Sequence, residues 1–314
     1  MVAAAAMASA SGLWSGVSAG AMPPRVVVAE RTCDLAADPV ACPRADLHGQ
    51  NLRARDLTGA NFYRANLSRA NLARADLTDA DLGWANLTRA RLVRADLTDT
   101  RLIEAQLTGA NLTGADLTDT LGGRADLTDT NLTNARLVRA DLDEADVTGA
   151  NLASADLTDA DVANADLTGA DLTGANLADA DLFSSDLTDT DLTDANLTDA
   201  NLTFVDLDGA NLTGVSWTGV GLTGVDLAGR DLTGTDLDSA DLDGVNLTKA
   251  NLTDANLFYV LLLGANLTKA NLTRANLSRA NLTGANLAKA NVAGVIWTGA
   301  TCPNGLKGPY PCTA

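Results

Sequence analysis

The chain has 314 residues, of which only 4% are aromatic, and a single histidine, His48. Its 22 basic and 40 acidic side chains give a formal net charge of −18, and a surface of that charge repels nucleic acid and anionic membranes. Apolar residues still make up 46% of the chain, so a buried core is expected and disorder is not. One histidine cannot supply both a zinc site and a general base, which argues against histidine-based catalysis.

Residues 1–30 are predicted to be a leader. Residues 1–21 are rich in Ala, Ser and Gly, and Ala19-Gly20-Ala21 resembles a signal-peptide cleavage site. The basic start of a signal peptide is missing, because the first positive side chain is Arg25. No run is long and apolar enough for a transmembrane helix. We expect a signal-like or disordered leader on a secreted or extracytoplasmic protein, with a cytoplasmic location as the alternative.

Residues 45–299 form a block of five-residue repeats without an insertion or deletion. One register, from Leu47 to Trp297, has 51 positions, and 44 of them are Leu. Ala stands two residues earlier in 35 units, and the residue between is Asp in 21 units and Asn in 21. The unit therefore reads A-(D/N)-L, often followed by Thr and then by Gly, Asp or Arg.

A period of five fits neither a continuous helix nor a continuous strand. On a helix, five residues advance about 500°, so successive Leu side chains would drift around every face. In one long strand, an odd period would send alternate Leu side chains to opposite faces. The pattern is satisfied if the chain turns once in every unit, with Ala and Leu pointing the same way. The last two residues then form a corner, and 18 of the block's 22 glycines stand at its second position. We predict an all-β solenoid.

Corners near 90° would close one coil in four units. Residues 65–84 and 85–104 echo each other at this 20-residue spacing, although a similar echo joins positions 90 and 135. Four units per coil would give about 13 coils and, at ~4.8 Å per coil, a rod roughly 60 Å long.

The A-(D/N)-L-x-x unit resembles the motif of the pentapeptide repeat proteins, and the resemblance covers about 80% of the chain. It implies a right-handed quadrilateral β-helix in which Leu and Ala point inward. The handedness comes from the resemblance alone. The family includes a quinolone-resistance branch that targets DNA gyrase as a DNA mimic.

Short caps are predicted at both ends of the block, over residues 31–44 and 300–314. All four cysteines lie in these caps. The terminal coils of a solenoid expose apolar edges that need a cover, and a disulfide at each end would hold one in place. Disulfides also favour an oxidising compartment. The predicted pairs are Cys33–Cys42 and Cys302–Cys312, with four free thiols as the alternative.

No catalytic, cofactor-binding or metal-binding constellation is recognised. The many aspartates repeat on a flat, solvated wall, where nothing would desolvate them or shift their pKa. No Gly-rich phosphate loop opens a helix, and Asp241 and Asp243 lack the remaining ligands of a calcium loop. We predict a non-enzymatic protein without a cofactor; an enzyme with an embedded carboxylate site is the weakest alternative.

The middle of the block is strongly acidic. Residues 141–248 hold 24 acidic side chains and one base, Arg230. Spread over roughly 26 Å, this charge is at least as dense as that of duplex DNA, which carries one charge per ~1.7 Å. A DNA mimic that inhibits or protects gyrase is therefore an alternative function, although the motif itself places Asp or Asn at every outward site. The candidate residues are Asp156, Asp159, Asp179, Asp186, Asp189 and Asp199.

A second surface feature is apolar. In residues 258–263 the register sends Val260 and Leu262 inward, while four apolar side chains face outward, where other units hold Thr, Gly, Asn and Asp. Such exposed patches often mark contacts. The candidate partner or dimer patch consists of Phe258, Tyr259, Leu261 and Leu263; cover by the tail after residue 298 is the alternative.

Gly122 and Arg230 break the inward register. Gly122 replaces a central Leu, which predicts a vacated core position, a bulge or a local bend. Arg230 replaces an inward Ala and must reach the surface or find a partner such as a nearby Asp.

Together, these features predict a rigid rod that acts as a protein-binding or structural module. Its expected partner is another protein or a second copy, with gyrase as the alternative partner, and neither nucleic acid nor a membrane span is expected.

Overall fold

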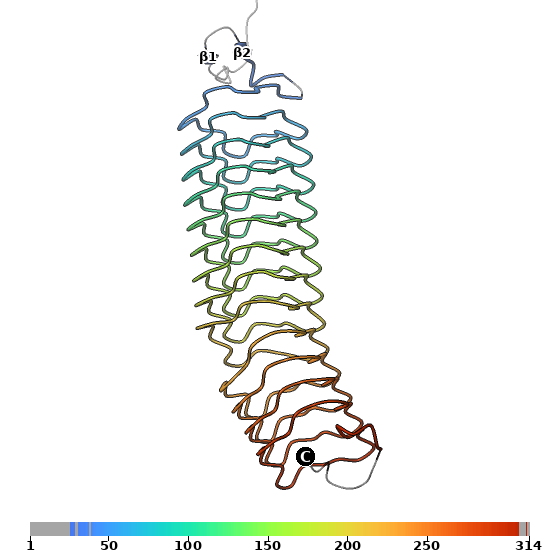
Figure 1. The fold of residues 1–314 in the computed structure, drawn as a ribbon. Coiled ribbons are helices and arrows are strands. Elements are labelled where there is room, and N and C mark those ends of the chain that lie inside the picture. Colours follow the sequence, from blue (N-terminus) through green and yellow to red (C-terminus); the bar gives the residue numbers. More distant parts are fainter. Residues whose placement is uncertain (1–25, 29–30, 38, 308–311, 313–314) are drawn as a thin grey trace, which may run out of the picture.

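The computed structural model describes residues 26–28, 31–37, 39–307 and 312. Two short strands, β1 (Val26–Val28) and β2 (Arg31–Cys33), form an antiparallel hairpin at one end of an elongated stack of coils (Figure 1). Within the described ranges, no helix is long and apolar enough to cross a membrane. Apart from β1, the predicted leader, including its cleavage-like Ala19-Gly20-Ala21, lies outside the described residues.

The stack is held together by parallel bridges between residues 20 apart, from Ala41↔Asn61 to Asn281↔Thr301. One coil therefore takes 20 residues, or four units. The amide of Leu172, for example, donates to the carbonyl of Asp191 on the next coil at 2.8 Å. In return, the amide of Asp191 donates to the carbonyl of Ala170 at 3.0 Å. The predicted inward register is present: Leu172 is 0% exposed and Ala170 is 1% exposed.

Each unit ends in a tight turn. The amide of Ala175 donates to the carbonyl of Leu172 at 2.9 Å, and Gly174 between them has φ +63°. A positive φ at the third residue is the mark of a type II β-turn and suits glycine. Many corners hold another residue there, such as Asp159 (φ +57°) and Asn164 (φ +56°), two residue types that tolerate this conformation.

Gly122 leaves the stack regular. Its amide donates to the carbonyl of Asp141 at 2.7 Å, so the ladder continues without a bulge. A Cβ on Gly122 would lie 3.0 Å from a methyl group of Leu142, which occupies the space that a leucine at this position would take. The missing central side chain is thus compensated by its neighbour one coil on.

The ladder is interrupted beside Arg230, between the coil that begins at Asp206 and the next one. The Arg230 guanidinium donates to the carbonyls of Ala210, at 3.0 Å, and Leu207, so its partners are backbone oxygens and not an aspartate. In Figure 1 the lower part of the rod leans away from the axis of the upper part at this level, in the yellow to orange coils. Within residues 39–307, the bridges absent here are Asp206↔Asp226, Asn211↔Asp231 and Ser216↔Asp236.

Candidate interaction surfaces

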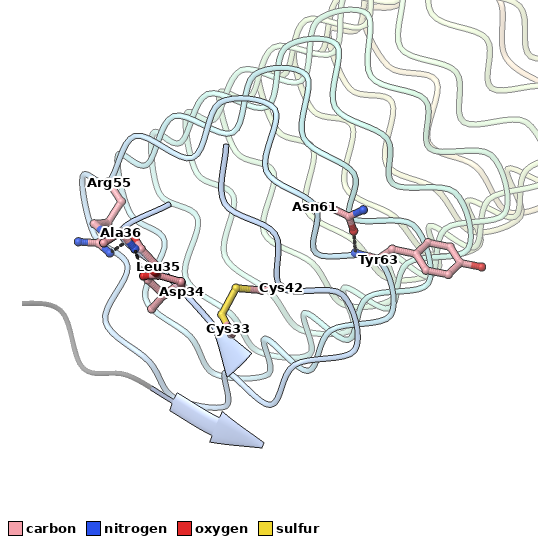
Figure 2. Close-up of a disulfide and its surroundings, with 8 residues drawn as sticks. All are labelled: Cys33, Asp34, Leu35, Ala36, Cys42, Arg55, Asn61 and Tyr63. Atoms are coloured by element: carbon pink, nitrogen blue, oxygen red, sulfur yellow. Dashed lines mark hydrogen bonds between the residues drawn. A yellow bond between two sulfur atoms is a disulfide. The ribbon is translucent and has the colours of Figure 1, made fainter. Parts of the chain in front are cut away.

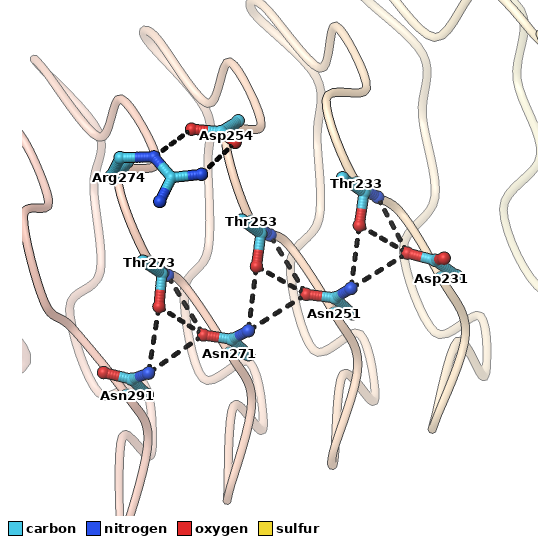
Figure 3. A network of polar contacts seen from close by, with 9 residues as sticks. All are labelled: Asp231, Thr233, Asn251, Thr253, Asp254, Asn271, Thr273, Arg274 and Asn291. Carbon is cyan, nitrogen blue, oxygen red and sulfur yellow. Dashed lines mark hydrogen bonds and ion pairs between the residues drawn. The ribbon is translucent and has the colours of Figure 1, made fainter.

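Outward Asp and Asn side chains cover the walls of the rod. Asn251 donates from Nδ2 to Oδ1 of Asp231, one coil earlier, at 3.1 Å, and to Oγ1 of Thr233 at 2.7 Å. Asn271 bonds to Asn251 and Thr253 in the same way, and Figure 3 shows the resulting chain of amides along one wall. Asn can therefore link successive coils, whereas an ionised Asp can only accept.

The six candidate aspartates of the acidic surface do not share one wall. Asp159, Asp179 and Asp199 lie 20 residues apart and so form one column along a corner, where all three are exposed. Asp156 and Asp186 differ by one and a half coils, which puts them on opposite sides of the rod. The acidic candidates therefore lie on more than one face of the rod.

One wall of this region holds a run of stacked carboxylates. Asp161 lies between Asp141 and Asp181 in successive coils. Partial burial, with these neighbouring charges, raises the pKa of Asp161 although the Ala163 amide donates to its carboxylate. Elsewhere a carboxylate faces a base on the next coil: the Arg139 guanidinium holds the pKa of Asp119 below its usual value.

The predicted apolar patch is largely open to solvent. Tyr259 is 50% exposed, Leu261 38% and Leu263 37%, while Phe258 is half-buried. The Phe258 and Tyr259 rings meet edge to face with centroids 5.0 Å apart. Arg279, one coil on, lies over both rings and donates to the Tyr259 hydroxyl at 3.2 Å. Val260 and Leu262 are fully buried, as the register predicts.

The other outward aromatic residues form small groups. Phe183 and Phe204, from successive coils, meet edge to face with centroids 5.9 Å apart. Trp84 shares the guanidinium of Arg64 with Tyr63. Neither contact was expected from the sequence, although a 20-residue coil would have placed both groups on one corner.

At the N-terminal end, Cys33 and Cys42 are joined, with their Cα atoms 4.8 Å apart (Figure 2). Leu35, only 7% exposed, lies within the loop that this bond closes. Arg55 takes an inward position in place of Ala and donates to the Leu35 carbonyl at 2.8 Å. The loop is therefore fastened to the first coils by a side chain as well as by sulfur.

At the other end of the stack, Cys302 and Cys312 are joined, with their Cα atoms 5.2 Å apart. The Cys302 amide donates to the carbonyl of Leu306 at 2.9 Å, and Thr301 bridges Lys307 in antiparallel fashion. Both cysteine pairs are the ones predicted from the sequence.

A hollow that sequence reasoning missed lies on the first coils. Its volume is about 300 Å³, and four arginines surround it: Arg53, Arg74, Arg91 and Arg94. The sequence contained a sign of this cluster, because Arg74 and Arg94 stand 20 residues apart, which is one coil. Among the described residues, no group of His, Cys, Asp or Glu side chains is placed to hold a metal ion.

Comparison with known proteins identifies the family. The family model of the pentapeptide repeats matches this chain in eight copies, over residues 44–79, 80–119, 123–159, 135–174, 150–189, 175–214, 222–257 and 262–299. The chain is a pentapeptide repeat protein. Pentapeptide repeat proteins fold as right-handed β-helices and are generally structural or binding modules.

Solved structures of pentapeptide repeat proteins also match. HetL, involved in heterocyst differentiation regulation in the cyanobacterium Nostoc sp. strain PCC 7120, is 34% identical; the match covers 79% of this chain and 93% of HetL, with a TM-score of 0.30. QnrB1, a plasmid-mediated fluoroquinolone resistance protein, is 18% identical; that match covers 62% of this chain and 88% of QnrB1, with a TM-score of 0.41. No curated protein matches the chain.

Proposed function

We propose that this pentapeptide repeat protein is a non-enzymatic rod that binds another protein or a second copy of itself through the apolar patch Phe258, Tyr259, Leu261 and Leu263. One observation carries the proposal. The residues one coil later at the same four positions are polar: Ser278, Arg279, Asn281 and Thr283. The patch is thus a local departure from the wall composition and not a property of the repeat, and clustered exposed apolar side chains are typical of contact surfaces.

The proposal extends to the architecture. Four units per coil with a turn after each suit a quadrilateral rod of about 13 coils over residues 45–299, at ~4.8 Å per coil. We assign residues 31–44 and 300–314 as caps and residues 1–30 as the leader. The two cysteine pairs support an oxidising, extracytoplasmic location, because disulfides persist in such compartments.

The test uses residues that the next coil already tolerates. The double variant Phe258→Ser with Leu261→Asn copies Ser278 and Asn281 onto the patch. We expect sedimentation to show loss of a dimer, or a pull-down with the intact rod to show loss of its protein partner, with only mild dependence on salt. An unchanged contact in the folded double variant would remove the patch from the proposal.

A second candidate is mimicry of DNA toward gyrase, favoured only by the 24 acidic side chains of residues 141–248. Its binding would weaken steeply with salt, and changing the six candidate aspartates to Asn would abolish it. The Asp159, Asp179 and Asp199 column alone should then account for most of the effect, because these residues share one corner. We expect a supercoiling assay to show gyrase unaffected by micromolar protein.

A further inference from the structure

Four arginines surround a hollow on the first coils of a protein with net charge −18. Arg53, Arg74, Arg91 and Arg94 are all exposed. Between them, Ala73 and Val93 line the hollow together with Asn71 and Thr113. The site therefore combines positive charge, an apolar lining and two neutral polar side chains within about 300 Å³.

Three other arginines at this corner position pair with an acid one coil away. Arg124 pairs with Glu144, Arg139 donates to Asp119, and Arg274 donates to Asp254, as Figure 3 shows for the last pair. Arg74 has instead Ala54 on the preceding coil and Arg94 on the following one. For the arginines of the hollow, no ion pair is present among the described residues.

Acids do lie around the corner, on the next wall. The carboxylate oxygen Oδ1 of Asp76 accepts hydrogen bonds from Thr78, and Asp96 accepts from Thr98 in the same way. These carboxylates complete the turns of their own units and do not come within ion-pair distance of Arg74 or Arg94.

The stacked charges remain uncompensated. Arg74 and Arg94 occupy equivalent positions in successive coils, ~4.8 Å apart along the rod, and like charges at such a spacing repel. The wall beside them carries Asn71, Arg91 and Asn111, with no carboxylate at these positions. A bound anion would relieve this repulsion, and each guanidinium presents a planar fork that fits carboxylate or phosphate oxygens.

We propose that this hollow binds a small ligand that carries two or more oxyanion groups, phosphate or carboxylate. The arginine forks of neighbouring coils would each take one group, and Ala73 and Val93 would contact the ligand's carbon skeleton. The volume lies at the lower end of that found for small-molecule sites, so a compact ligand fits best. This site lies far along the chain from the apolar patch, and its binding does not depend on that proposal.

The test is calorimetric titration of the full-length protein in low-salt buffer with two probes, tripolyphosphate and citrate, which separate phosphate from carboxylate recognition. The test variant is Arg74→Asn with Arg94→Asn, since Asn134 and Asn164 already occupy corner positions of this kind. The matched control is Arg44→Asn with Arg101→Asn, which removes two exposed charges from the same end of the rod outside the hollow.

We expect one probe to bind with one-to-one stoichiometry, the test variant to weaken it by about tenfold or more, and the control to change it by less than about twofold. Absence of binding by both probes, or equal weakening by the control, would overturn the proposal. Tighter binding of a short DNA duplex through the same arginines would assign the surface to nucleic acid instead. A dimer lost in the test variant would assign it to the acidic middle of a second copy.

Discussion

The coils before Asp206 and the coil from Asp206 to Val225 are built from the same five-residue unit, yet only the earlier coils keep all their ladders. In the earlier coils every wall bonds to the coils before and after it. The later coil keeps all four bridges to its predecessor, but its one bridge to its successor within residues 39–307 is Gly221↔Asp241. The repeat motif alone therefore does not ensure a continuous stack.

The difference lies in the inward side chains. Phe62 replaces a central Leu in an early coil, and its amide still donates to Asp81 at 2.7 Å, so one larger core residue is tolerated. Two larger inward side chains, Trp217 and Arg230, lie in the two coils that border the interruption. Trp217 is 1% exposed, and in the described part of the chain its Nε1 has no acceptor. Arg230 donates to the carbonyl of Ala210, to which the Asp231 amide would donate in a regular coil.

The corner glycines of the two coils differ in their neighbours. A Cβ on Gly209, Gly214 or Gly219 would overlap the carboxylate of an aspartate one coil earlier. A Cβ on Gly229 or Gly234, in the next coil, would meet no atom within 4 Å. This contrast follows from the residue one coil earlier, which is an aspartate before Gly209, Gly214 and Gly219 and a glycine without a side chain before Gly229 and Gly234.

The largest expected effect distinguishes the two regions by burial. Leu172→Asp should place an unpaired charge among stacked leucines and destabilise the fold by about 3–5 kcal/mol, measured by chemical denaturation. Leu212→Asp, at a half-buried position in the interrupted coil, should cost clearly less. Asp171→Asn is the control and should be nearly neutral, because Asn fills 21 outward sites. Equal costs for the two leucines would contradict the difference in packing.

Hydrogen exchange should detect the interruption directly. The amides of Leu212 and Trp217 lack the partners that Leu172 and Leu177 have on the next coil, so they should exchange faster, by about tenfold or more. Arg230→Ala restores the usual inward residue and frees the Ala210 carbonyl, so the Asp231 amide should become more protected. Equal exchange at Leu172 and Leu212 in the wild-type protein would show that the ladder is continuous in solution.

The regular region was predictable because its determinants are local. The inward register and the corners follow from side-chain alternation and from turn preferences within five residues, as Leu172 and Gly174 illustrate. The cysteine pairs were predictable because two cysteines lie close together at each end of the block and none lies within it. Arg230 was recognised as irregular, but the broken ladder was not, since it depends on which carbonyls of the previous coil its guanidinium reaches.

The surfaces were harder to predict, because they join residues from different coils. The arginine hollow brings together Arg53 and Arg74, which lie 21 positions apart in the sequence. The acidic candidates show the converse: Asp156 and Asp186 belong to one charged stretch of the sequence but lie on opposite sides of the rod. Only the coil length converts sequence distance into position on a wall, and the sequence echo supported that length only modestly.

The smallest expected effect concerns the stacked carboxylates of the regular region. Asp161→Asn should raise the melting temperature at pH 7 by roughly 1–2 °C, because it removes a charge between Asp141 and Asp181. The new amide can donate to Asp141, as Asn201 donates to Asp181 at 2.9 Å. Asp231→Asn is the contrasting change. The Thr233 hydroxyl lowers the pKa of Asp231, so its ionised form is stabilised and removing it should bring no gain.

The direction of the pKa shift of Asp161 determines how the stability gain from Asp161→Asn depends on pH. The pKa of Asp161 is raised in the fold, so the folded protein holds this proton more tightly than the unfolded chain. Its favourable contribution is complete below the unfolded value of 3.8 and is lost as pH rises through the folded pKa. Asp161→Asn should therefore gain stability at pH 7 and lose that gain near pH 3. For Asp231 the order is reversed: the contribution is present above 3.8 and disappears as pH falls through its lowered pKa. A gain from Asp161→Asn that is the same at both pH values would exclude the carboxylate stack as its cause.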